Sequence, residues 1–260
     1  MFGFGNPGRF FGPADMLHTY KNMECSVGGG TAVVSVNKYR NANKPSAEKG
    51  GCQHALVIKD RLRGVAKDAW PRAGGVAAYV EVFMGKGSPW AIASVLETFA
   101  VYSDAFINAY KNSKGTPEAK CAAILANDDI TWEQTLQKIC DEYIGLDCNG
   151  FVGNWLKVVQ PDFKLNQNHK ADEVRTKAKT YRTELAQIEF WDVMCYTQNE
   201  HIAAVNGAGG APGSFMVAQS AGGGPRMNEF KFLKTGTRTF RLAAPTPQDI
   251  GNEFYVISLW

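Results

Sequence analysis

One stretch of the chain, which opens at Cys148, constrains the fold more than any other. Large apolar side chains recur there at the spacing of a single helical face: Phe151, Val152, Trp155, Leu156 and Val159. Pro161 cannot continue the run, because proline lacks the amide hydrogen that a helix interior needs. The pattern therefore predicts an apolar helix that begins with a cysteine and stops before a proline.

The place of Cys148 in the first turn of that helix has a chemical consequence. The positive end of the helix dipole favours a thiolate over a thiol. Thiolate is the nucleophilic form of cysteine, as a cysteine hydrolase requires. Downstream, His201 begins the short strand-like run at residues 201–205. The order predicts a nucleophile on a helix followed by a general base on a strand.

The residues around these two side chains resemble the signature of one enzyme family. They read Asp-Cys-Asn-Gly-Phe-Val at 147–152, Trp-Asp-Val-Met at 191–194 and His-Ile-Ala-Ala-Val at 201–205. The NlpC-type, papain-like cysteine peptidases and amidases carry Asp-Cys-Ser-Gly-Phe-Val, then Gly-Asp entering a strand, then His-Val-Ala-Ile-Val. Asn149 stands where that family has serine, and Trp191 stands where it has glycine.

A third element of the family, a strand with a polar residue before a turn of small residues, is similar to residues 217–223. The resemblance covers about residues 130–260, the size of one domain. It implies a papain-like core. Helices followed by neighbouring strands also predict an α+β fold, with an antiparallel sheet packed against the nucleophile helix.

Side-chain alternation indicates a third member of the catalytic group. If the strands that carry His201 and Gln219 pair, Gln219 can hold the ring nitrogen that faces away from Cys148. A neutral amide there fixes the geometry of the imidazole. Asn206 and Ser220 are nearby alternatives for the same role.

Three further residues are expected to contact substrate. Tyr143, five residues before Cys148, is expected to line the cleft as an upstream tyrosine does in the resembling family; the alternative is a core aromatic residue. Asp147 and Asn149 flank the nucleophile directly. No cofactor is expected. No metal is expected either, because the histidines have no companions at ligand spacing.

The resemblance implies a peptidoglycan amidase or endopeptidase that cleaves an amide bond in cell-wall stem peptides. One alternative is a cysteine-dependent toxin that deamidates, transglutaminates or cleaves a target protein. Another is a binding protein of the same fold that has lost activity, which the serine-to-asparagine change at Asn149 makes conceivable. The partners expected are a peptidoglycan peptide and an immunity or delivery protein.

The first residues, 1–9, have neither the basic nor the long apolar region of a standard secretory signal. We therefore expect delivery by injection or lysis, as for an antibacterial effector or a phage-type lysin, with action in the periplasm or cell wall. No stretch approaches the ~20 apolar residues that would cross a bilayer, so no transmembrane segment is expected.

Charge is divided unevenly along the chain. Residues 1–115 contain 14 Lys and Arg against 8 Asp and Glu, whereas residues 116–260 contain 14 against 17. We expect an accessory region over 1–115 and the cysteine amidase domain over 116–260. The basic excess between residues 38 and 72 can hold an anionic partner or form a solvated surface, and no nucleic acid is expected.

The six cysteines are an even number, but a chain of this length does not need disulfides to be stable. We expect mostly buried thiols. One or two disulfides remain open among Cys25, Cys52, Cys121 and Cys140, whereas Cys148 is expected as a thiol.

Local patterns predict the remaining elements. The first thirty residues are expected to form an irregular arm. The predicted strands are 31–36, 55–58, 76–83 (for which a helix is also open), 201–205, 215–220, 239–243 and 254–259, and the predicted helices are 88–110, 119–126, 131–143 and 169–187. The glycine clusters at 207–213 and 222–224 are expected to be hairpin connections.

Overall fold

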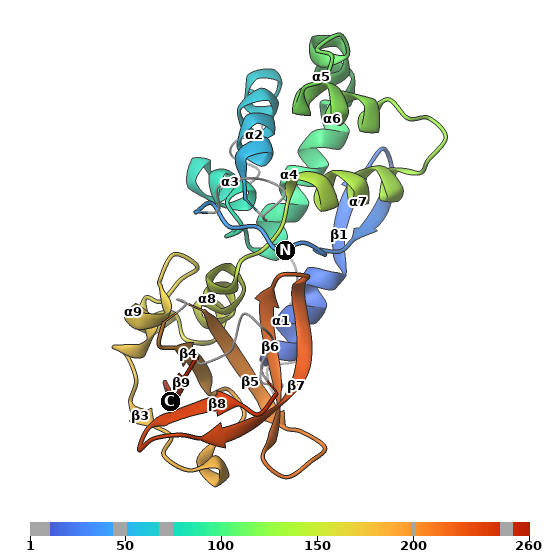
Figure 1. Ribbon diagram of the computed structural model, residues 1–260. Helices are drawn as coiled ribbons and strands as arrows, with labels where there is room; N and C mark the ends of the chain where they lie inside the picture. Colours follow the sequence, from blue (N-terminus) through green and yellow to red (C-terminus); the bar gives the residue numbers. More distant parts are fainter. Residues whose placement is uncertain (1–10, 44–50, 68–74, 199–200, 245–251) are drawn as a thin grey trace.

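The computed structural model describes residues 11–43, 51–67, 75–198, 201–244 and 252–260. Figure 1 shows helices α2 to α7 gathered at one end of the molecule and the strands β3 to β9 at the other, with α1 and α8 lying against the strands. The fold is α+β: a helical N-terminal region and a C-terminal six-stranded antiparallel β-barrel.

The described part of the chain has regular structure where an irregular arm is predicted, and residues 1–10 of that arm lie outside the described residues. Helix α1 spans Pro13–Lys21, and strands β1, Met23–Val27, and β2, Gly30–Val34, form an antiparallel hairpin. Met16 and Tyr20 are buried one helical turn apart, and together they give α1 an apolar side. The prediction of an irregular arm is wrong from residue 13 onward, whereas the strand predicted at 31–36 is confirmed as β2.

Six helices follow the hairpin within the described residues of the first half. They are α2 Gln53–Val65, α3 Val76–Phe83, α4 Pro89–Val101, α5 Ser103–Tyr110, α6 Pro117–Leu125 and α7 Trp132–Tyr143. The strand predicted at 55–58 is wrong. Ala55, Ile58 and Leu62 are buried at helical spacing, and Leu62 lies outside the four residues on which the strand prediction depends. For residues 76–83 the helical alternative is correct.

Capping residues begin three of these helices. Ser88 and Thr116 accept hydrogen bonds from the backbone three residues on, and Thr131 forms a reciprocal capping box with Gln134. The helix predicted over 88–110 is present as two pieces, α4 and α5, bent by 67°. Within the described ranges no single helix is long and apolar enough to span a membrane, although this bent pair meets the criterion together by length and composition.

Helix α8 spans Cys148–Val159, as predicted, and is followed by the short helix η3, Pro161–Phe163. The helix predicted at 169–187 is wrong. That segment contains α9, Ala171–Arg175, the two-residue strand β3, Thr180–Tyr181, and η4, Leu185–Gln187. Within α9 only Ala171 and Val174 are buried, so the segment has no apolar stripe to extend a helix.

Six strands close the C-terminal sheet into a barrel. They are β4 Val193–Tyr196, β5 Ile202–Ala208, β6 Ser214–Ala221, β7 Gly224–Lys234, β8 Thr239–Leu242 and β9 Phe254–Ser258. Neighbours pair antiparallel in the order β9-β4-β5-β6-β7-β8, and β8 returns to pair with β9. The predicted antiparallel strands are confirmed, and both glycine clusters connect paired strands. β7 lies in a segment for which no element is predicted.

Two apolar cores meet at strands β5 and β6. Aromatic side chains including Phe215, Phe232 and Phe254 fill the inside of the barrel. The other core joins α8 to the helical region and to the outer face of the barrel, and Trp155 is its largest fully buried side chain. Because α8 packs directly on β5 and β6, the start of α8 lies at the junction of the two halves of the chain.

Candidate active site

The start of α8 is fixed by hydrogen bonds on both sides of Cys148. The Asp147 carboxylate caps the helix by accepting from the Gly150 N–H at 2.5 Å. The Asp147 N–H donates to the Gly85 carbonyl at 2.9 Å, and the Leu146 N–H donates to the Lys38 carbonyl at 3.0 Å. Cys148 is therefore held in the first turn of α8 by two segments from the first half of the chain.

Glycine is required where these segments meet. A Cβ atom on Gly150 would lie 2.2 Å from the Gly85 carbonyl oxygen, and one on Gly85, which has φ +79°, would lie 2.1 Å from the Arg40 carbonyl oxygen. A Cβ atom on Gly145 would lie 2.8 Å from the Lys38 carbonyl oxygen. Packing thus explains why residue 150 is glycine: the backbone of the first half lies directly against the start of α8 and leaves no room for a side chain.

Cys148 lies against the beginning of β5. Its side chain is buried, and the backbone N–H of Ile202 hydrogen-bonds to its sulfur. Ile202 follows His201 directly, so the backbone of His201 lies close to Cys148.

His201 and Gln219 are joined as the strand alternation predicts. His201 Nε2 lies 2.8 Å from Gln219 Oε1, and Gln219 is buried on β6. An amide oxygen only accepts hydrogen bonds, so Nε2 carries the hydrogen and Nδ1 is the nitrogen that can take a proton. The edge of the imidazole also meets the Tyr196 ring, at 5.2 Å between centroids.

The two alternatives to Gln219 have other partners. Asn206 Oδ1 accepts from the Ala14 N–H at 3.0 Å, which ties α1 to β5. Ser220 Oγ donates to the Leu146 carbonyl at 2.5 Å, next to the start of α8. Among the three candidates, the hydrogen bonds of the described residues therefore place Gln219 on the imidazole.

The electrostatic surroundings of Cys148 differ from the expectation for a thiol at a helix N-terminus. Burial raises the pKa of Cys148 to about 12, and the negative charge of Asp147 acts in the same direction. The Ile202 N–H, Lys86 and the Asn149 N–H oppose that rise without cancelling it. The thiol is thus protonated at neutral pH, and a base must remove its proton before it can attack a carbonyl.

Both carboxylate oxygens of Asp147 have partners within the protein. Oδ1 accepts the capping bond from Gly150, and Oδ2 forms an ion pair with Lys86 Nζ at 2.6 Å. Burial raises the pKa of Asp147 to about 6, while Lys86 and the Gly150 N–H oppose the rise. This carboxylate, predicted to contact substrate, serves in the structure to hold α8.

Asn149 presents a buried acceptor beside the nucleophile. Its side-chain Oδ1 is shielded from solvent and has no hydrogen-bond partner among the described residues. Buried amide oxygens almost always have a donor, so an orphaned one next to Cys148 is a place where a ligand N–H can bind.

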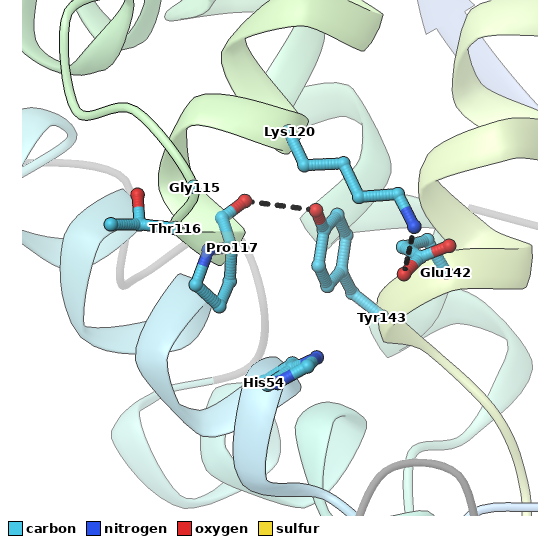
Figure 2. A pocket seen from close by; sticks show the side chains of 7 residues that line it. All are labelled: His54, Gly115, Thr116, Pro117, Lys120, Glu142 and Tyr143. Atoms are coloured by element: carbon cyan, nitrogen blue, oxygen red, sulfur yellow. Dashed lines mark hydrogen bonds and ion pairs between the residues drawn. The ribbon is translucent and has the colours of Figure 1, made fainter.

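Tyr143 lies in a different hollow from the one expected. It lines a pocket of about 390 Å³ (Figure 2). Its hydroxyl donates to the Pro117 carbonyl at 2.9 Å, and Lys120 pairs with Glu142 at 2.6 Å. The lining residues are His54, Gly115, Thr116, Pro117, Lys120, Glu142 and Tyr143. Cys148 and His201 are not among them.

A second tyrosine, Tyr39, lies within electrostatic reach of the nucleophile. Burial raises the pKa of Tyr39, and the charge that a Cys148 thiolate carries adds to that rise, which places Tyr39 within its electrostatic reach. The Tyr39 hydroxyl accepts from Asn41 Nδ2 at 3.2 Å. Tyr39 and Lys86 come from loops without periodicity, so local pattern gave no signal for either.

Trp191, which departs from the family pattern, has a backbone conformation that favours glycine. Its φ is +79°, in the left-handed region that bulky residues rarely adopt. Its ring lies 4.9 Å from that of Trp260 and meets the edge of Trp155 at 6.5 Å. Asp192 follows it, fully buried, immediately before β4. These aromatic contacts support a conformation in which glycine is otherwise preferred.

None of the six cysteines forms a disulfide, so the disulfides left open by the sequence are not present. Within the described part of the chain no group of three His, Cys, Asp or Glu side chains is arranged to hold a metal ion. No protein-family model, curated protein or solved structure matches the chain.

Proposed function

We propose that this chain is a cysteine amidase or endopeptidase that cleaves an amide bond in peptidoglycan stem peptides. Cys148 is the nucleophile, His201 the general base and Gln219 the residue that orients the imidazole. The observation that carries the proposal is the 2.8 Å contact of His201 Nε2 with Gln219, made where the Ile202 N–H meets the Cys148 thiol.

The reaction would follow two displacements. His201 Nδ1 takes the thiol proton as the sulfur attacks the amide carbonyl, and the same proton then passes to the leaving amine. This step forms a thioester and releases the amine. A water molecule then attacks the thioester while His201 takes its proton, and return of that proton to sulfur releases the acid and restores the thiol.

The raised pKa of Cys148 determines how the nucleophile is activated. A thiol with a pKa near 12 carries little thiolate at neutral pH, so proton transfer to His201 has to accompany attack. The backbone N–H groups at the start of α8 are suited to bind the oxyanion that forms. The Oδ1 atom of Asn149 is suited to accept an N–H of the bound peptide.

The choice of substrate depends on the likeness of residues 147–152, 191–194 and 201–205 to the NlpC-type family. The left-handed backbone of Trp191 supports that likeness, because the family has glycine at this position. We extend the proposal to a papain-like catalytic core and to delivery as an antibacterial effector or phage-type lysin. Residues 1–115 then act in part to shape the site, since Gly85 and Lys86 contact α8.

Digestion of purified sacculi by the wild type and Cys148→Ser tests the proposal. Cys121→Ser is the matched control, because Cys121 is a buried cysteine of α6 in the helical region. We expect new amine and carboxyl ends by mass spectrometry for wild type and control, and a loss of at least ~10³-fold for Cys148→Ser.

A folded, reduced wild type that releases no fragments would overturn the wall substrate. Deamidation, cross-linking or cleavage of protein substrates that depends on Cys148 would then favour the protein-directed toxin. Neither activity, together with a Cys148 thiol that labels no faster than in denatured protein, would favour a binding protein.

A further inference from the structure

The loop at residues 85–87, between α3 and α4, is held against the nucleophile helix by its backbone. The Gly85 carbonyl accepts from the Asp147 N–H at 2.9 Å, and the Lys86 carbonyl accepts from Asn154 Nδ2 of α8 at 3.0 Å. These bonds fix the Lys86 side chain relative to the first turn of α8, although the two segments are some sixty residues apart in the sequence.

Lys86 directs its charge at the helix cap. Its ammonium lies 2.6 Å from Asp147 Oδ2, and the two side chains are only 16% and 3% exposed. The other oxygen, Oδ1, binds the Gly150 N–H. A single carboxylate thus links a buried ammonium to the start of α8, and both charges are shielded from water, where their fields act most strongly.

We infer that Lys86 is a positioning residue for the nucleophile: it holds the Asp147 carboxylate as the cap of α8 and offsets that carboxylate's charge at the Cys148 thiol. The inference rests on the proposed function, in which Cys148 attacks the substrate. It assigns the first half of the chain a part in setting the reactivity of a cysteine in the second half.

The charges around Cys148 agree with this role. Asp147 raises the pKa of the thiol and Lys86 lowers it, while the hydroxyl of Tyr39 lies within electrostatic reach. His201 stands one residue before the backbone N–H that meets the sulfur. Without the ammonium, the carboxylate would oppose thiolate formation unless it took up a proton itself.

The rate of alkylation of Cys148 by iodoacetamide, measured against pH, tests the inference. We compare the wild type with Lys86→Met, Lys86→Arg, Asp147→Asn and the double variant Lys86→Met/Asp147→Asn, and identify the labelled peptide by mass spectrometry. Lys86→Met should move the curve to higher pH by about 1–2 units, and Asp147→Asn should move it to lower pH. Lys86→Arg should keep the wild-type curve, and the double variant should fall between the two single ones.

Lys120→Met is the matched control. Lys120 also pairs with a carboxylate at 2.6 Å, that of Glu142, but this pair is at the surface and away from the described contacts of Cys148. Its curve should coincide with that of wild type. A Lys86→Met curve that also coincides with wild type, in folded protein, would overturn the inference, and so would a double variant that behaves as Lys86→Met alone.

Two further readouts separate the competing explanations. A merely structural role for Lys86 would lower the urea midpoint of unfolding and leave the alkylation curve in place. Alkylation needs no wall substrate, so a shifted curve in a protein that does not digest sacculi would retain the effect of Lys86 on the Cys148 thiol and remove the proposed function. If the curves do not shift but the wild type digests sacculi, the inference about Lys86 is overturned and the proposed function is retained.

Discussion

Asp147 and Asp192 are both buried aspartates that bind a cation, one at the start of α8 and the other at the entry to β4. Two nitrogens of Arg182 donate to the Asp192 carboxylate, at 2.8 and 3.0 Å, and the Glu189 N–H is a third donor at 2.8 Å. Asp147 instead has a single ammonium, that of Lys86, and one backbone donor. Each carboxylate thus binds a cationic side chain and a backbone N–H, but the surroundings of the two differ.

The difference lies in what stands beside each carboxylate. Asp192 is flanked by Trp191 and packs where β4 begins, so its pair with a planar, bidentate arginine fixes the chain. Asp147 is followed by Cys148, and any charge it carries acts on the thiol. The ion pair of Asp192 thus holds the fold, and we infer that the ion pair of Asp147 also sets the reactivity of the neighbouring thiol.

Removing the cation should affect the two pairs unequally. Arg182→Met leaves Asp192 fully buried with no guanidinium, and we expect a loss of about 3–5 kcal/mol in the free energy of unfolding, measured by urea denaturation at pH 7. Lys86→Met should cost less, because Asp147 loses one bond to an ammonium, whereas Asp192 loses two bonds to a guanidinium.

Of the two variants, Lys86→Met should have the larger effect on alkylation of Cys148. The curve of alkylation rate against pH should shift in Lys86→Met and stay in place in Arg182→Met, provided that Arg182→Met is assayed where it remains folded. Equal losses of stability together with equal shifts of the curve would show that the two pairs are not different in kind.

Removing the amide that binds the imidazole should affect activity without the cost of a buried charge. Gln219→Ala deletes the acceptor of His201 Nε2, so the ring loses its fixed orientation and turnover of sacculi should fall by about 10²-fold. Asn206→Ala is the control, because its Oδ1 binds the Ala14 N–H instead of the imidazole. Comparable turnover in the two variants would rule out an orienting role for Gln219.

The pH dependence of stability should show the buried charge of Asp147 directly. Its pKa is about 6 in the folded protein and near 3.8 when unfolded, so the folded state binds more protons between these values. The free energy of unfolding of the wild type, relative to Asp147→Asn, should therefore fall as the pH rises from 4 to 7, by roughly 2–3 kcal/mol. A relative stability that rises over this window would show that Lys86 fully compensates the charge.

Much of the site could be predicted from sequence because its parts are local. The helix that opens at Cys148 follows from apolar periodicity, and strand alternation places His201 and Gln219 on one face. The aspartate before the cysteine is the helix cap in the structure, a role that its residue type indicates, although it was predicted to contact substrate. In each case the signal lies within a few residues of the feature.

The remainder depends on contacts between distant segments. Neither the loop of Lys86 nor that of Tyr39 has a pattern that points toward α8, and their approach becomes visible only when glycines at 85, 145 and 150 are seen to leave no room for a Cβ atom. The strand prediction for residues 55–58 is wrong for another reason, since four apolar residues fit a strand as well as a helix. Tertiary packing decides both.

The smallest effect we expect distinguishes the two tyrosines. Tyr143→Phe removes a hydroxyl that donates to the Pro117 carbonyl, so the free energy of unfolding should fall by about 1 kcal/mol while turnover of sacculi stays at the wild-type level. Tyr39→Ala should instead speed alkylation of Cys148, because it removes a bulky side chain near the buried thiol and lets water and the reagent reach the sulfur. A loss of turnover in Tyr143→Phe at unchanged stability would return Tyr143 to the substrate cleft, and would mean that the pocket shown in Figure 2 opens onto the nucleophile.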